Sequence, residues 1–172
     1  DGVLPGLGVL ADGDPCLDTH FYSDPDEPLR AWAAGLKARG VTRIAGDLVI
    51  DRSRFTGPER PATYPQDHDN QQSWYSAPAS AFAWNDNCIE VKATPGVLGG
   101  PATLRVRPVS SRFTVTNLTK TATRAKTFLI GNRADTNNDL TVSGVFSSPV
   151  DWQPFAIHQD ADLLAGDQFK RV

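Results

Sequence analysis

From Cys88 onward the sequence consists of short runs that suit β-strands, separated by residues that favour turns. In several runs apolar and polar residues alternate, as with Leu104 and Val106, which is typical of a sheet with one face exposed to water. Gly, Pro, Ser, Asn and Asp stand between the runs. The pattern predicts strands over 88–93, 102–108, 113–117, 126–132 and 140–146. A mainly helical fold is therefore excluded for this half of the chain.

The first half carries the clearest helix, over residues 28–39. Proline suits its first turn, Gly40 suits the position after its end, and Asp26 or Ser23 could cap its start. A strand is expected over 42–51. The apolar stripe that would pack this helix on a sheet consists of Leu29, Trp32, Ala33 and Leu36. With a further helix expected to begin at Ala161, the chain is predicted to be α+β and β-rich.

Residues 52–69 join these two halves and are rich in Pro, Asp, Arg and Gly. Pro58, Pro61 and Pro65 prevent a regular strand ladder there, so we expect a long surface loop. Loops of this length within a compact domain are often functional. The four tryptophans, in contrast, show no spacing that would line one strand face, and we expect them in the core or at a domain interface.

Composition excludes several functions. The chain has 172 residues, 40% hydrophobic and 22% charged, with a formal net charge of −3, so no basic surface for nucleic acid is indicated. No apolar run reaches the roughly 20 residues of a membrane-spanning helix. The chain begins with Asp1 and contains no methionine, and we therefore expect a processed or excised piece of a longer protein.

Cysteines and histidines give no sign of a metal site or a cofactor. Cys16 and Cys88 are the only cysteines, and their spacing leaves open whether they pair or remain free thiols. His20, His68 and His158 are scattered along the chain. No metal ligand and no cofactor is therefore predicted.

Three segments carry a family resemblance. Residues 46–55 read GDLVIDRSRF, residues 76–78 read SAP before a small-residue run toward Asn87 and Val91, and residues 11–17 read ADGDPCL. Together, with 11–17 upstream of the other two, they resemble the insert of the S13 family of D-alanyl-D-alanine carboxypeptidases/endopeptidases, the class C low-molecular-mass penicillin-binding proteins. The resemblance implies an extracytoplasmic protein that acts on peptidoglycan.

An insert must return its chain near the point of departure, so we expect nested subdomains. A small β subdomain over 92–145 would lie within a mixed α/β subdomain made of 1–91 and 146–172. Asp1 and Val172 would then lie on the same side of that outer subdomain.

The catalytic motifs of penicillin-recognising enzymes are absent. No serine is followed by lysine three residues later or by asparagine two residues later. The two Lys-Thr pairs, at Lys120 and Lys126, continue with Ala122 and Phe128 in place of glycine. We therefore predict no catalytic residue and an inactive chain. The resemblance implies that a serine-type parent enzyme would supply these motifs from a transpeptidase-like domain outside this chain.

The polar sequence Asp67-His68-Asp69-Asn70 stands at the end of the Pro-rich loop. It could be a solvated polar loop. The resemblance implies instead that an acidic residue here reaches the active-site cleft and binds the free amino group of the peptidoglycan stem peptide. A carboxylate paired with an ammonium group would orient the substrate. Asp69 is the favoured residue and Asp67 the second choice.

Asp135, Asn137 and Asp139 have the spacing of the first ligands in a calcium-binding loop. Leu140 replaces the required glycine, however, and Phe146 stands at the twelfth position, so a β-turn is predicted.

The second hypothesis for the function of the whole chain is a free-standing extracellular β-rich module that binds cell-wall glycan or a protein partner.

Overall fold

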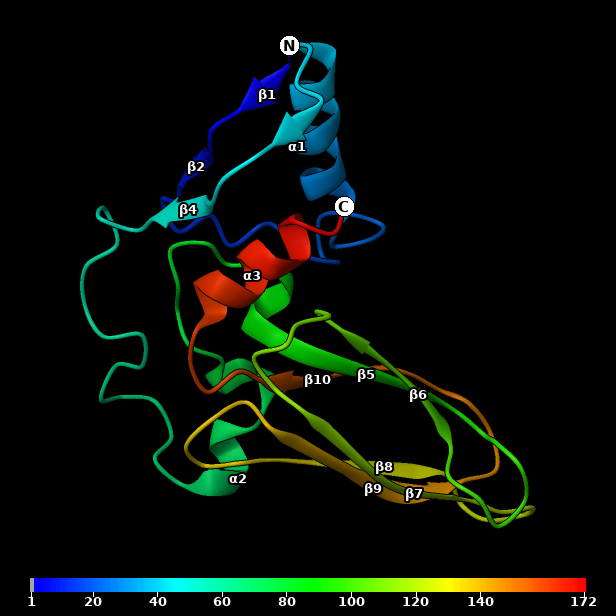
Figure 1. Cartoon of the computed structure of the whole chain (residues 1–172). Coiled ribbons are helices and arrows are strands. Elements are labelled where there is room, and N and C mark those ends of the chain that lie inside the picture. Colours follow the sequence, from blue (N-terminus) through cyan, green and yellow to red (C-terminus); the bar gives the residue numbers. More distant parts are fainter. Residues whose placement is uncertain (1) are drawn as a thin grey trace. The chain divides into compact units, whose positions relative to one another are not determined.

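The computed structural model describes residues 2–172, and these form two compact units. The first unit contains residues 2–61, 79–87 and 160–172, and the second contains 62–78 and 88–159. Figure 1 follows both from the N-terminus in blue to the C-terminus in red. The chain is β-rich with few helices, which confirms the expected α+β class.

A two-stranded parallel ribbon forms the start of the first unit (Figure 1). Strand β1 (Val3–Leu4) pairs with β3 (Arg43–Ile44), and β2 (Leu7–Leu10) pairs with β4 (Leu48–Asp51). Parallel strands need a long crossover, and here it contains helix α1 (Glu27–Ala38). The strand expected over 42–51 is thus divided into β3 and β4.

A glycine explains why the ribbon is divided. A Cβ atom at Gly46 would lie 2.0 Å from the backbone carbonyl oxygen of Pro5, so only glycine allows this approach. Pairing resumes at Leu7, whose N–H donates to the carbonyl of Asp47 at 2.9 Å. The strands β1 and β2 were not expected, because they are short and are separated by Pro5 and Gly6.

Helix α1 agrees with its expected position within one residue at each end. Asp26 is the N-terminal flanking residue, but its side chain makes no capping hydrogen bond, and Ser23 Oγ instead donates to Glu27 at 3.0 Å. The expected side-chain cap is therefore wrong. Gly40 follows the helix with φ of 84°, as expected for a left-handed position.

The hydrophobic core of the first unit joins α1, the segment 79–87 and helix α3 (Ala161–Phe169). Helix α3 begins at the expected residue. Trp84 is buried there and its indole N–H donates to the carbonyl of Pro25 at 2.9 Å. The buried members of this core are Ala11, Leu17, Leu29, Ala81, Phe82, Trp84, Ala165 and Phe169.

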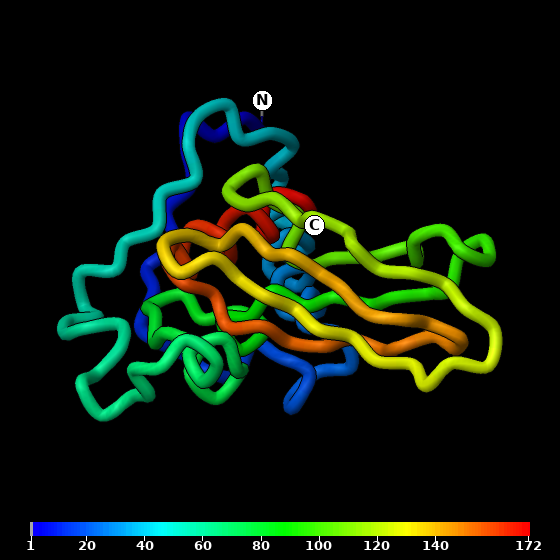
Figure 2. Tube along the Cα trace, turned by 90° about the horizontal axis from the view of Figure 1, so that it is seen from below, coloured from blue at the N-terminus to red at the C-terminus, as the bar shows by residue number. Residues whose placement is uncertain are grey.

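Two three-stranded sheets make up most of the second unit, and Figure 2 traces their strands from green to orange. One has the order β10 (Val150–Ala156), β5 (Cys88–Thr94), β6 (Thr103–Arg107), and its strands are antiparallel. The other has the order β7 (Val115–Thr121), β9 (Leu140–Phe146), β8 (Phe128–Arg133), with β7 parallel to β9. Residues of both sheets share one core, built on Ala93, Ala102 and Phe146.

All five strands expected from Cys88 onward are present; β9 agrees with its expected bounds, and the other four have shifted ends. Strand β10 was not expected, because it contains Pro154 and is interrupted by a bulge between Val150 and Gln153. Its place at the edge of the sheet explains why a proline is tolerated there.

The expected domain division stays a prediction. By contacts, 62–78 and 88–91 group with the sheets of the second unit, as do 146–159. The expectation for Asp1 concerns a residue outside the described range. Val172 belongs to the first unit.

Candidate functional site

The polar loop at the end of the Pro-rich segment folds into a short helix, α2 (His68–Gln71), followed by a 3-10 turn, η1 (Trp74–Ser76). Asp67 is the N-cap of α2. Its carboxylate accepts hydrogen bonds from the backbone N–H of Asn70 at 3.1 Å and from the Asn70 side chain at 2.9 Å. The Asn70 amide, and then its backbone N–H, lower the pKa of Asp67. Asp67 therefore has a structural role as a helix cap.

His68 and Asn70 are also held by neighbours within the second unit. His68 Nδ1 hydrogen-bonds the carboxylate of Asp135, and His68 Nε2 lies 2.6 Å from the amide nitrogen of Gln72. Asn70 Oδ1 accepts a hydrogen bond from the hydroxyl of Tyr75. Three of the four polar residues in this loop are thus occupied by contacts that shape it.

Asp69 is the exception. Its side chain is exposed, and among residues 2–172 no hydrogen bond or ion pair engages its carboxylate. It faces a pocket of about 370 Å³. The pocket is lined by Asp69, Gln72, Ser73, Trp74, Tyr75, Gly131, Pro154 and Phe155. Asp69 is therefore the one group in the loop that is available to a ligand.

Two aromatic side chains stand exposed beside this carboxylate. Trp74 is 55% exposed and Tyr75 is 53% exposed, and their ring centroids are 6.0 Å apart in an edge-to-face arrangement. Aromatic faces attract organic cations, and a carboxylate pairs with them. The pocket is therefore suited chemically to an ammonium group attached to an apolar stem.

The floor of the pocket is closely packed. A Cβ atom at Gly131 in β8 would lie 2.3 Å from the ring of Phe155 in β10, so the ring lies directly over the glycine backbone. Gln72 connects α2 to both strands, since its side-chain oxygen accepts from the N–H of Arg133 and its carbonyl accepts from Ala156 at 2.8 Å. Asp69 is thus presented by a helix fixed to the sheets.

The structure bears on three further groups of residues. Asn137 Oδ1 accepts from the N–H of Asp139 at 2.8 Å, and Asp139 Oδ1 accepts from the N–H of Thr114 at 2.7 Å, so both side chains hold the connection between β8 and β9. Neither Cys16 nor Cys88 forms a disulfide. Of the tryptophans, Trp84 is in the core as expected, whereas Trp74 is exposed, and a domain-interface role for Trp74 stays a prediction.

Sequence reasoning missed the wall of this pocket. Gly131, Pro154 and Phe155 are far from Asp69 in the chain and reach it only through the pairing of the strands. A signal was present at Trp74 and Tyr75, since two large aromatic residues directly follow a polar loop. Asp18, His20 and Asp86, which also meet in space, were not connected either.

Comparison with known structures shows which class of protein has this fold. Penicillin binding protein 4 from Haemophilus influenzae superposes with a TM-score of 0.67 at 24% identity, over 99% of this chain and 37% of that one. Its complex with a β-lactam superposes with a TM-score of 0.56 at 22% identity, over 99% of this chain and 34% of that one. The fold is therefore that of a region of a penicillin-binding protein.

Sequence comparison identifies the family. Residues 6–172 match the D-Ala-D-Ala carboxypeptidase 3 (S13) family, and the chain belongs to it. A D-alanyl-D-alanine carboxypeptidase from Actinomadura sp. (strain R39) is 29% identical over 184 residues, covering 99% of this chain and 32% of the relative. The chain thus spans about a third of the length of the relatives it matches. Within residues 2–172, every helix is too short or too polar to cross a bilayer.

Proposed function

We propose that this chain is the non-catalytic insert region of a serine-type D-Ala-D-Ala carboxypeptidase/endopeptidase that acts on peptidoglycan outside the cytoplasm. Family membership supports the reaction, and the lack of Ser-x-x-Lys, Ser-x-Asn and Lys-Thr-Gly supports the non-catalytic role. The nucleophile and its base would come from a transpeptidase-like domain of the same polypeptide, here called the parent enzyme. The insert would shape access to the substrate cleft.

The pocket of α2 and η1 would hold the free amino group of the stem peptide. The observation that carries this proposal is the Asp69 carboxylate, which has no partner among residues 2–172 and stands beside the exposed rings of Trp74 and Tyr75. The ammonium group would pair with Asp69 while the rings cover its methylene stem. Such a contact far from the scissile bond orients the substrate and favours one substrate over another.

A pair of substrates tests this role in the parent enzyme. One peptide ends in D-Ala-D-Ala and carries a free stem amine, and the other is identical except that the amine is acetylated. We expect a higher kcat/KM for the free amine by roughly 5- to 150-fold, because acetylation removes the charge that Asp69 binds. Equal kcat/KM values for the two peptides would contradict the proposal and favour the alternative of a module with a different ligand.

The chain alone should be catalytically inert. Without a serine that has a lysine partner, no acyl-enzyme can form. We expect no mass increase after incubation with a β-lactam and no release of D-Ala from a D-Ala-D-Ala peptide. The measurement is intact-protein mass spectrometry, with a known penicillin-binding protein as the positive control. Stoichiometric labelling would show that the chain contains a nucleophile and that the non-catalytic role is wrong.

A further inference from the structure

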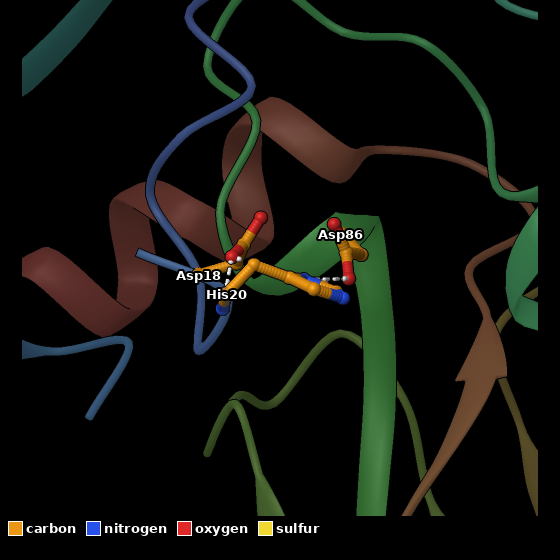
Figure 3. A group of neighbouring side chains, drawn as sticks. All are labelled: Asp18, His20 and Asp86. Atoms are coloured by element: carbon orange, nitrogen blue, oxygen red, sulfur yellow. Dashed lines mark hydrogen bonds and ion pairs between the residues drawn. The ribbon is translucent and has the colours of Figure 1, made fainter. Parts of the chain in front are cut away.

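Three side chains with metal-binding atoms meet within the first unit (Figure 3). Asp18 and His20 lie in the loop between β2 and α1, and Asp86 lies in the 3-10 turn η2 (Asn85–Asn87). His20 Nδ1 is 3.2 Å from Asp18 Oδ1 and 3.7 Å from Asp86 Oδ2. All three atoms lie within 4.8 Å of one another.

These separations suit a small divalent cation. Nitrogen and oxygen ligands lie about 2.0–2.2 Å from Zn²⁺, so two ligands of a tetrahedral site are about 3.4 Å apart. The two separations from His20 Nδ1, 3.2 Å and 3.7 Å, lie on either side of that value. One imidazole and two carboxylates are a ligand set that Zn²⁺ accepts, with water in the remaining position.

A cation at this place would stabilise the buried carboxylate of Asp18. Its side chain is only 4% exposed, and no lysine or arginine within residues 2–172 forms an ion pair with it. A buried carboxylate is costly unless a positive charge or a metal compensates it. The side chain of His20, which lies between the two carboxylates, is 69% exposed, so an ion from solution can enter.

The two segments that supply the ligands are held together by the backbone. The N–H of Asn85 donates to the carbonyl of Leu17 at 2.8 Å, directly beside Asp86 and Asp18. Asp18 Oδ1 also accepts from the backbone N–H of His20 at 2.6 Å, which fixes the buried carboxylate. The three ligands are therefore held near one another without the ion.

We propose that Asp18, His20 and Asp86 form a binding site for a divalent transition-metal cation of the Zn²⁺ type. The ion would connect the loop before α1 to η2 across the first unit. This site is independent of the amine pocket and requires no activity of the parent enzyme.

Calorimetric titration of the chelator-treated chain with Zn²⁺ tests the site directly. We expect one equivalent of Zn²⁺ to bind with a Kd of about 10 μM or tighter. His20→Ala and Asp86→Asn should each weaken binding by at least about 100-fold, since even partners outside the coordination shell contribute 10- to 100-fold. Asparagine tolerates the left-handed backbone of position 86, where φ is 54°, so this variant should fold.

Two control variants separate this site from other zinc ligands in the chain. His68→Ala removes a second histidine that faces a carboxylate, and Cys16→Ser removes the thiol nearest in sequence to Asp18. Both should bind Zn²⁺ like the unmodified chain, and circular dichroism should show all four variants folded. Absence of binding, or binding that survives both His20→Ala and Asp86→Asn, would overturn the proposal. So would binding that is lost only in a control variant.

Discussion

Asp69→Asn in the parent enzyme should lower kcat/KM for a peptide with a free stem amine by about 5- to 150-fold, which corresponds to roughly 1–3 kcal/mol of transition-state stabilisation. The substitution keeps the size of the side chain and removes its charge, so an ammonium group loses its counter-ion. The acetylated peptide should change far less. The measurement is steady-state kinetics on both peptides with the unmodified enzyme and the variant.

Asp67→Asn is the matched control, because the two carboxylates are two residues apart and differ in their contacts. Asp67 caps α2 through Asn70, whereas Asp69 has no partner within residues 2–172. Asp67→Asn should affect both peptides equally, through the position of the loop. Equal losses for both peptides in Asp69→Asn would mean that Asp69 acts only in folding or docking, and its role in binding substrate would be abandoned.

The second large effect concerns stability. Glu90→Ala should destabilise the chain by about 3 kcal/mol, the lower end of the cost of breaking a buried ion pair. Glu90 in β5 faces Arg107 in β6, and Arg107 Nε donates to the Glu90 carboxylate. Their side chains are only 11% and 17% exposed. The variant leaves the Arg107 charge partly buried, stacked on Trp152 at 4.3 Å and still within the electrostatic reach of Asp151. Urea unfolding measures the loss.

Asp151→Ala provides a control on the same sheet. Asp151 pairs with Lys92 at 2.8 Å, but the aspartate is exposed and water compensates the loss. The urea midpoint should hardly change. Comparable losses for Glu90→Ala and Asp151→Ala would show that burial of the Glu90–Arg107 pair is not the source of the effect.

Local sequence patterns predicted the elements in which several signals indicate the same structure. Helix α1 has proline at its start, an apolar stripe and Gly40 after its end, and the strands from Cys88 onward are separated by residues that favour turns. The patterns failed where tertiary contacts override them. Strand β10 tolerates Pro154 only because it is an edge strand, and the break at Gly46 depends on the nearby carbonyl of Pro5.

The sequence predicted only part of the candidate site. A short polar run contains both Asp67 and Asp69, and the family resemblance implied that an acidic residue of this run binds the substrate. Which of them is available to a ligand depends on the cap that Asn70 forms with Asp67, and sequence spacing does not reveal it. The aromatic wall and Gly131 come together only when β8 and β10 are placed.

A crystal structure of the parent enzyme with a bound peptide that carries a free stem amine is the most direct test of the amine pocket. We expect the ammonium nitrogen about 2.7–2.9 Å from a carboxylate oxygen of Asp69, the distance of a charge-assisted hydrogen bond. The methylene stem should lie against Trp74 and Tyr75. An ammonium group that points to solvent, or that binds a different carboxylate, would contradict the assignment of this pocket.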